Sequence, residues 1–230
     1  MVKVIEKLRT KVNKIIRSLR WKIEYLRERL EGFIGIYRVD TKHIYTQEEN
    51  ALIEQSVKEV KKFFPEPPGK TLIKEDFQSR CDAIEEFADR LTKVYGMKDV
   101  EIIITDDTDI FPQDGTLYFG STRMQERIVY INANLLLLED EDILGHLIGT
   151  VIHELRHIMQ YEIMTLVNTR GVPYQRRKAW RHATVNYINS EYDMEGYMQQ
   201  SIEFDARNFT NRIWRGVYKR NIPLGGNGYV

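Results

Sequence analysis

Residues 150–163 read TVIHELRHIMQYEI and contain the pattern H-E-x-x-H, formed by His153, Glu154 and His157 in a mostly apolar stretch. On an α-helix, residues four apart lie on one face, about 6 Å from each other. The two imidazoles therefore point the same way, and each can offer a ring nitrogen to one zinc ion. Glu154 lies at the edge of that face, where a carboxylate can act as general base towards a metal-bound water.

The alternative is a helix that carries two histidines by chance. With 5 His and 21 Glu among 230 residues, roughly 0.01 matches to H-E-x-x-H are expected at random. The stretch therefore predicts a helix with a metal centre, and we expect one Zn²⁺ ion as the cofactor.

A catalytic zinc site takes three protein ligands, so a third must come from elsewhere. His146 lies seven residues before His153, about 10 Å along the helix axis, and is too far away to share the ion. The pattern H-E-x-x-H-x-x-G-x-x-H of the metzincin peptidases is excluded, because positions 160 and 163 are Gln160 and Ile163.

The third ligand should then be an acid on a later helix, and the candidates are Glu191, Glu195 and Glu203. Glu203 is preferred, because Ala206 one turn later is small enough to let two helices approach closely. Glu191 remains the second choice.

Length and composition indicate a globular protein with a substantial core, since 42% of residues are hydrophobic and 30% are charged. The 34 Lys and Arg balance the 34 Asp and Glu, which gives no strong signal for a nucleic-acid partner. The single cysteine, Cys81, favours a reducing, cytoplasmic setting. No segment approaches the roughly 18 consecutive apolar residues of a membrane span.

The chain divides into three expected parts. Residues 1–33 form a basic amphipathic helical arm, in which 3–31 hold ten Lys and Arg against four Glu. Its apolar stripe could pack on the main body or mediate self-association, or its basic face could contact a membrane surface or nucleic acid. Residues 34–75 form a helical segment and linker. Residues 76–230 form the domain that carries the motif and ends in a flexible tail.

Local signals predict the elements around the motif. The capping box Thr46–Glu49 begins a helix that the proline-rich stretch 65–70 ends, and a further helix covers 77–95. Strands are expected at 100–105 and 127–132, with a hairpin-like excursion between them. The acidic cluster 139–142 suits the first turn of the motif helix.

The fold class is therefore α+β. A small, twisted, mostly antiparallel sheet packs on the motif helix and on a C-terminal helix with the ligand glutamate, and extra helices precede them.

The sequence IHELRH, after the strand RIVYIN and before IEFDARNF, resembles the gluzincin metallopeptidases. The resemblance is greatest to the minimal gluzincins and the ImmA/IrrE-type, repressor-cleaving metallopeptidases. It implies an intracellular zinc endopeptidase in which His153, His157 and Glu203 bind the metal and Glu154 is the base. Other gluzincins carry an aspartate four residues after the ligand glutamate to support the first histidine. Arg207 stands there in this chain, although Asp205 could serve instead.

The expected substrate is a polypeptide that lies extended along an exposed edge of strand 127–132. The residues expected to line this edge are Ile128, Tyr130 and Asn132. The side chains that could assist the developing oxyanion are Tyr187, Tyr197 and His182. The alternative function is a structural or interaction protein with a latent or vestigial zinc site, which works through its N-terminal helix.

Overall fold

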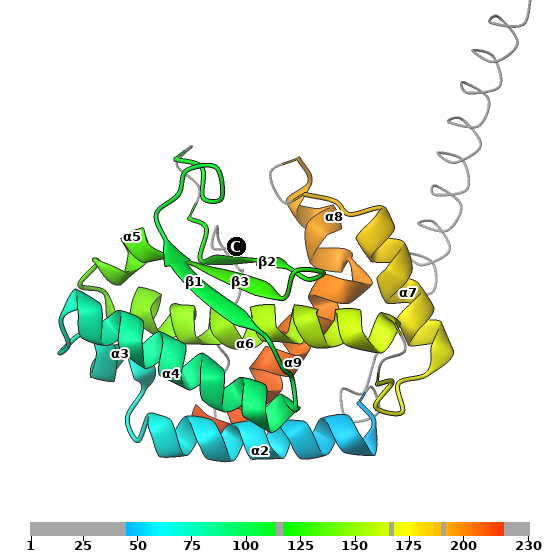
Figure 1. Ribbon diagram of the computed structural model, residues 1–230, viewed down its shortest axis with the longest axis horizontal. Helices are drawn as coiled ribbons and strands as arrows, with labels where there is room; N and C mark the ends of the chain where they lie inside the picture. The colour runs from blue at the N-terminus through cyan, green and yellow to red at the C-terminus, as the bar shows by residue number, and fades with distance from the viewer. Residues whose placement is uncertain (1–44, 114–116, 166–167, 190–191, 219–230) are drawn as a thin grey trace, which may run out of the picture. The chain divides into compact units, whose positions relative to one another are not determined.

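The helix that carries the motif, α6 (Glu141–Met164), runs through the middle of the fold (Figure 1). The computed structural model describes residues 45–113, 117–165, 168–189 and 192–218. The arm expected at 1–33 and the expected C-terminal tail lie outside the described residues. The described residues belong to one compact unit. The boundary expected at residue 75 stays a prediction.

The start of α6 follows from the acidic cluster that precedes it. The Asp140 side chain accepts hydrogen bonds from the backbone N–H groups of Asp142 and Ile143, at 2.9 and 3.0 Å. Glu141 and Asp142 add negative charge at the positive end of the helix dipole. From Leu144 onward most side chains of α6 are buried, because the helix is covered on several sides.

A three-stranded sheet packs on α6 through its strands β2 (Gly120–Arg123) and β3 (Ile128–Asn132). The third strand, β1 (Glu101–Thr105), completes the order β1-β3-β2. β3 pairs with β1 in parallel and with β2 in antiparallel orientation. The α+β class is thus confirmed, but the sheet is mixed rather than mostly antiparallel.

The prediction that 127–132 forms an exposed edge is wrong. β3 is the central strand, and its main-chain groups are paired on both sides. Ile128, Tyr130 and Asn132 therefore cannot receive an added strand. Among the residues that the structure describes, the edge strands of the sheet are β1 and β2.

The N-terminal helices begin and end where the local signals predict. α2 (Gln47–Phe63) has both hydrogen bonds of the capping box at Thr46. α4 (Phe77–Tyr95) ends at Gly96, which adopts φ 63°. The proline-rich stretch ends α2 as expected but also contains a short helix, α3 (Pro68–Leu72). A Cβ on Gly69 would lie 1.8 Å from the Glu141 carbonyl oxygen, so only glycine lets α3 approach the start of α6 this closely.

The remaining helices are α5 (Ala133–Leu136), α7 (Tyr174–Val185), α8 (Met194–Gln199) and α9 (Ser201–Tyr218). α9 crosses α6 and also packs against α2 and α7 (Figure 1). Ala206 is fully buried, which agrees with the close helix approach expected there. The crossing places the early part of α9 opposite the histidines of α6.

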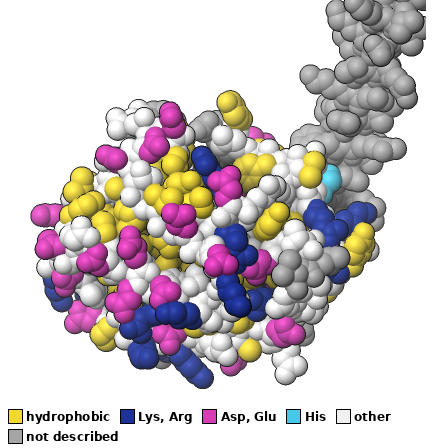
Figure 2. All heavy atoms as spheres, in the orientation of Figure 1, with side chains coloured by type: hydrophobic (Ala, Val, Ile, Leu, Met, Phe, Trp, Pro, Cys, Tyr) yellow, Lys and Arg dark blue, Asp and Glu magenta, His cyan; other side chains and the backbone are white. Residues whose placement is uncertain are grey.

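The edge strand β1 presents a partly apolar surface. Its isoleucines at 102, 103 and 104 are only half-buried, and Figure 2 shows apolar side chains gathered in this region with acidic side chains around them. No helix among the described residues is both long and apolar enough to cross a membrane.

Candidate metal centre

The structure brings His153 and His157 of α6 together with Glu203 of α9. One potential ligand atom from each residue lies within 4.8 Å of the others. His157 and Glu203 are buried, whereas His153 is slightly exposed, with 12% of its side chain accessible. The three ligands predicted from the sequence therefore form one cluster, and His153 is the most exposed of the three.

The spacing of these atoms suits a zinc ion. The Nε2 atoms of His153 and His157 are 3.0 Å apart. The Glu203 oxygens lie 3.3 Å from Nε2 of His153 and 3.5 Å from Nε2 of His157. Two atoms bound at about 2.0–2.1 Å to one tetrahedral zinc ion are themselves about 3.3 Å apart. A zinc ion would thus need little rearrangement of these side chains.

The orientation of His157 is fixed by Gln160, one turn further along α6. Nδ1 of His157 lies 2.8 Å from Oε1 of Gln160. The Gln160 amide nitrogen donates to Asp205 Oδ2 at 2.7 Å and to the Ile202 carbonyl at 2.9 Å. Because both contacts of that nitrogen are acceptors, the amide cannot be reversed, and its oxygen must face Nδ1. Nδ1 of His157 therefore carries a proton, and Nε2 is directed at the cluster.

Two tyrosines hold the carboxylate of Glu203. Tyr187 donates to Oε1 at 2.9 Å, and Tyr197, from α8, donates to Oε2 at 2.8 Å. Burial of each hydroxyl and the neighbouring Glu203 charge raise the pKa of both phenols, so both remain protonated donors. These tyrosines, predicted as helpers of the oxyanion, contact Glu203, the expected third ligand.

Glu154 lies beside the cluster, as the motif predicts. It is 8% exposed, and its Oε2 accepts a short hydrogen bond from the hydroxyl of Thr122 on β2. Burial raises the pKa values of both tyrosines and opposes the rise at His157, while the Glu203 carboxylate and, to a smaller extent, the Glu154 carboxylate raise all three pKa values. This electrostatic effect requires Glu154 to be close to all three groups.

The cluster carries a buried ion pair in the metal-free protein. Burial alone would lower the pKa of His157, but the Glu203 carboxylate raises it to about 9. Burial alone would raise the pKa of Glu203, but the two imidazoles hold it well below its usual range. In the metal-free protein the imidazole of His157 is thus cationic and the carboxylate of Glu203 is anionic. A divalent ion bound between them would replace the extra proton of His157.

Behind the cluster lies a second set of buried charges, centred on Arg156 of the motif. The fully buried Arg156 donates to Asp205 at 2.9 Å and to Glu49 of α2 at 2.5 Å. Glu49 also accepts a short hydrogen bond from Arg176 of α7. Burial would lower the pKa of Arg156, but the carboxylates of Asp205 and Glu49 raise it. The guanidinium also packs over the Phe209 ring, 4.6 Å from its centroid.

Some of the candidate residues lie elsewhere. His182 is exposed on α7 and is not a member of the cluster. His146 contacts the Asp142 carbonyl and the Phe119 ring. Glu195 is exposed on α8 and accepts from Gln199, while Glu191 lies outside the described residues. Asp205, expected to support the first histidine, instead reaches the second one through Gln160.

Gln160 and Thr122 were not predicted as site residues. Gln160 had a usable signal, because a residue three positions after His157 shares its helix face. Thr122 had no such signal in the sequence, since its approach to Glu154 depends on how β2 lies on α6. Gly120 permits that approach, because a Cβ there would lie 2.6 Å from Thr150 Cγ2 and 3.0 Å from the Tyr130 carbonyl oxygen.

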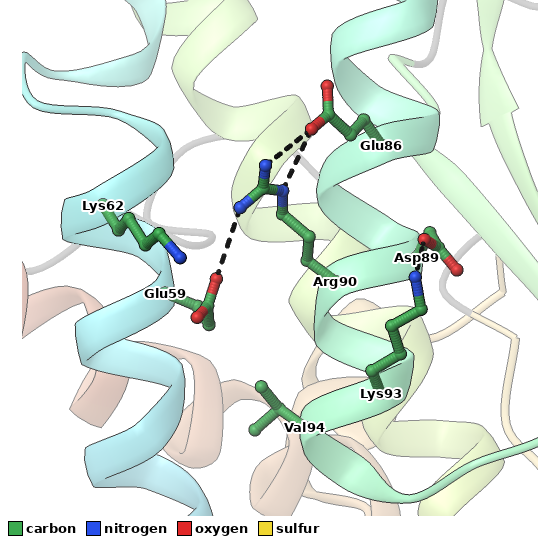
Figure 3. Close-up of a pocket in the computed structure, with 7 residues that line it drawn as sticks. All are labelled: Glu59, Lys62, Glu86, Asp89, Arg90, Lys93 and Val94. Atoms are coloured by element: carbon green, nitrogen blue, oxygen red, sulfur yellow. Dashed lines mark hydrogen bonds and ion pairs between the residues drawn. The ribbon is translucent and has the colours of Figure 1, made fainter.

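A separate depression of about 540 Å³ lies between α2 and α4 (Figure 3). It is lined mostly by charged side chains, and Arg90 at its centre pairs with Glu86 at 2.7 Å and with Glu59 at 3.8 Å. None of its lining residues belongs to the cluster of His153, His157 and Glu203. Most of its charges are paired with one another, which is typical of a solvated helix surface.

Comparison of the chain with protein-family models, curated proteins and solved structures gave no match. The functional argument therefore depends on the geometry of the cluster and its neighbours.

Proposed function

We propose that the protein is a zinc-dependent endopeptidase of the gluzincin type, in which Glu154 is the general base. The observation that carries this proposal is the convergence of three ligand atoms, from His153, His157 and Glu203, within 4.8 Å. A buried carboxylate directly after the first histidine adds the second required element. Metal clusters of this composition also occur without catalysis, so Glu154 distinguishes the enzyme hypothesis from simple metal binding.

The donor set fits zinc, which prefers two imidazoles and a carboxylate in hydrolytic sites. When bound, zinc would supply Lewis-acid chemistry that lowers the pKa of a water and polarises the scissile carbonyl. Nε2 of His157 and the carboxylate of Glu203 would be suitable ligands once His157 has lost the proton on Nε2.

The chain's own residues would handle the protons. Glu154 would accept the proton of the attacking water and return it to the leaving amine. Thr122 donates to one carboxylate oxygen and so orients the group. Tyr187 donates to Glu203, so its hydroxyl would be close to a carbonyl bound at the zinc ion.

The polypeptide substrate would pair with β2 instead of β3. β2 is an edge strand, and its Thr122 contacts the proposed base. An extended peptide added to this edge would gain main-chain hydrogen bonds and pass beside Glu154.

Cys81 is a buried free cysteine, which is compatible with the reducing, cytoplasmic setting that we propose.

The alternative is a zinc-binding protein without peptidase activity. The test is to incubate the zinc-loaded full chain with an unfolded, casein-like substrate, with and without a chelator. We expect cleavage that the chelator abolishes. Glu154→Gln should retain zinc and lose activity by several orders of magnitude, whereas the exposed control Glu85→Gln should match the wild type. Zinc binding without cleavage would favour the alternative.

A further inference from the structure

We propose that Gln160 is a positioning residue, which sets the metal-binding face of His157 through a chain of buried hydrogen bonds that begins at Glu49 of α2. The inference rests on the proposed zinc site and adds a requirement that H-E-x-x-H does not contain. It makes α2, far from the motif in sequence, part of the support of the metal centre.

The link nearest the metal is the contact between Gln160 and His157. An imidazole that binds zinc through Nε2 must carry its proton on Nδ1, and the partner of Nδ1 decides this choice. Gln160 Oε1 is an acceptor only, and it lies 2.8 Å from Nδ1. Without it, the buried ring could rotate or move its proton to Nε2, and the lone pair would no longer face the cluster.

The next link prevents Gln160 from turning. Its amide nitrogen donates to Asp205 Oδ2 and to the Ile202 carbonyl, both on α9. Gln160 is fully buried, so no water can replace these acceptors easily. The amide is therefore locked between α6 and the helix that supplies Glu203.

The outer links keep Asp205 in place. The same Oδ2 atom accepts from Arg156 Nε at 2.9 Å, and Arg156 donates to Glu49 at 2.5 Å. Asp205 and Arg156 are both almost completely buried, which strengthens each charged hydrogen bond. Glu49 and Asp205 thus both hold Arg156, and the Asp205 position follows from the packing of three helices.

Two variants of the full-length protein separate positioning from structural support. Gln160→Met keeps the length of the side chain but offers Nδ1 only the weak acceptor of a thioether. Gln160→Glu can still accept from Nδ1, yet it can no longer donate to both α9 acceptors. The probe is zinc, measured by competition with a chromophoric chelator, together with the thermal stability of the metal-free protein. Gln78→Leu, at an exposed position of α4, is the control.

We expect Gln160→Met to bind zinc about 10- to 100-fold more weakly than the wild type. Gln160→Glu should lose stability but keep a zinc affinity close to that of the wild type. In ¹⁵N spectra of the zinc-loaded protein, the wild type and Gln160→Glu should show a protected Nδ1 proton on His157 that Gln160→Met lacks.

The outcomes distinguish this inference from the proposed function. If the wild type binds no zinc, both are overturned. If the wild type binds zinc and Gln160→Met binds it equally well, only the role of Gln160 is overturned. Equal loss of affinity in Gln160→Met and Gln160→Glu would also overturn it, since the retained acceptor would then have no effect.

Discussion

Arg156 and Glu49 form a hydrogen bond of 2.5 Å across 107 residues of sequence, and both side chains are fully buried. Burial of two charges costs free energy, and their mutual attraction offsets much of that cost only while both partners are present. The pair therefore makes the attachment of α2 to the rest of the fold sensitive to single substitutions.

Removal of the Glu49 charge should destabilise the protein strongly. Glu49→Gln leaves Arg156 with less compensation for its buried charge, and we expect a loss of about 3–5 kcal/mol in the free energy of unfolding. Chemical denaturation of the metal-free protein measures it. The matched control is Glu59→Gln, also on α2, where the partly exposed ion pair with Arg90 at 3.8 Å should contribute about 1 kcal/mol or less. Similar losses for both variants would contradict the importance of burial.

Zinc affinity and metal-free stability should respond to pH in opposite directions. In the metal-free protein the pKa of His157 is raised from 6.5 to about 9. The stabilisation from its protonated form is thus complete below pH 6.5 and disappears as pH rises through about 9. Zinc must displace this proton, so its apparent affinity should rise about tenfold per pH unit towards pH 9.

Thermal unfolding of the metal-free protein and zinc competition, both measured between about pH 6 and pH 9, test this opposition. The chelator's own protonation has to be corrected at each pH. A zinc affinity that does not change over this interval would mean that no proton leaves the cluster on binding.

Gly120 should be essential for the position of the Glu154 carboxylate. Gly120→Ala places a Cβ against Thr150 and the Tyr130 carbonyl, which should cost about 1–3 kcal/mol and push β2 away from α6. Thr122 would then lose its contact with Glu154, and peptidase activity should fall further than stability alone explains.

Gly145→Ala is the control for Gly120→Ala. Within α6, its added Cβ would meet only the Gly69 nitrogen at an ordinary 3.7 Å. Alanine should therefore stabilise the helix by about 0.5–1 kcal/mol without affecting activity. A Gly120→Ala protein with full stability and activity would refute the packing argument.

The two tyrosines on Glu203 should support zinc binding together. Replacement of both Tyr187 and Tyr197 by phenylalanine removes the hydrogen bond to each carboxylate oxygen. We expect zinc affinity to fall by about 10- to 100-fold, as measured by chelator competition. Tyr174→Phe, at an exposed position of α7, should bind zinc as the wild type does. A double variant with unchanged zinc affinity would show that the Glu203 carboxylate does not need these two hydrogen bonds to bind zinc.

The sequence predicts elements whose signals are local. Thr46 with Glu49 marks the start of α2, Gly96 ends α4, and Asp140 caps α6, because each acts within one helical turn. The convergence of His153, His157 and Glu203 was also predictable, since the i, i+4 spacing and the small Ala206 limit how α6 and α9 can meet.

The pairing of β3 and the burial of Arg156 were not predictable in this way. The alternation in 127–132 identifies a strand but does not specify which strands pair with it. Arg156 looks like a solvated charge within the motif, because its carboxylate partners are 49 and 107 residues away. Only the tertiary fold brings them together.

The placement of Glu203 on α9 has a consequence for biosynthesis. A nascent chain that has emerged only as far as α7 already displays both histidines, but it lacks the acid that would complete their coordination. Capture of the ion should consequently be a late event, which reports that the final helix has docked. A ribosome-bound fragment ending before residue 200 should retain zinc far less well than the released polypeptide.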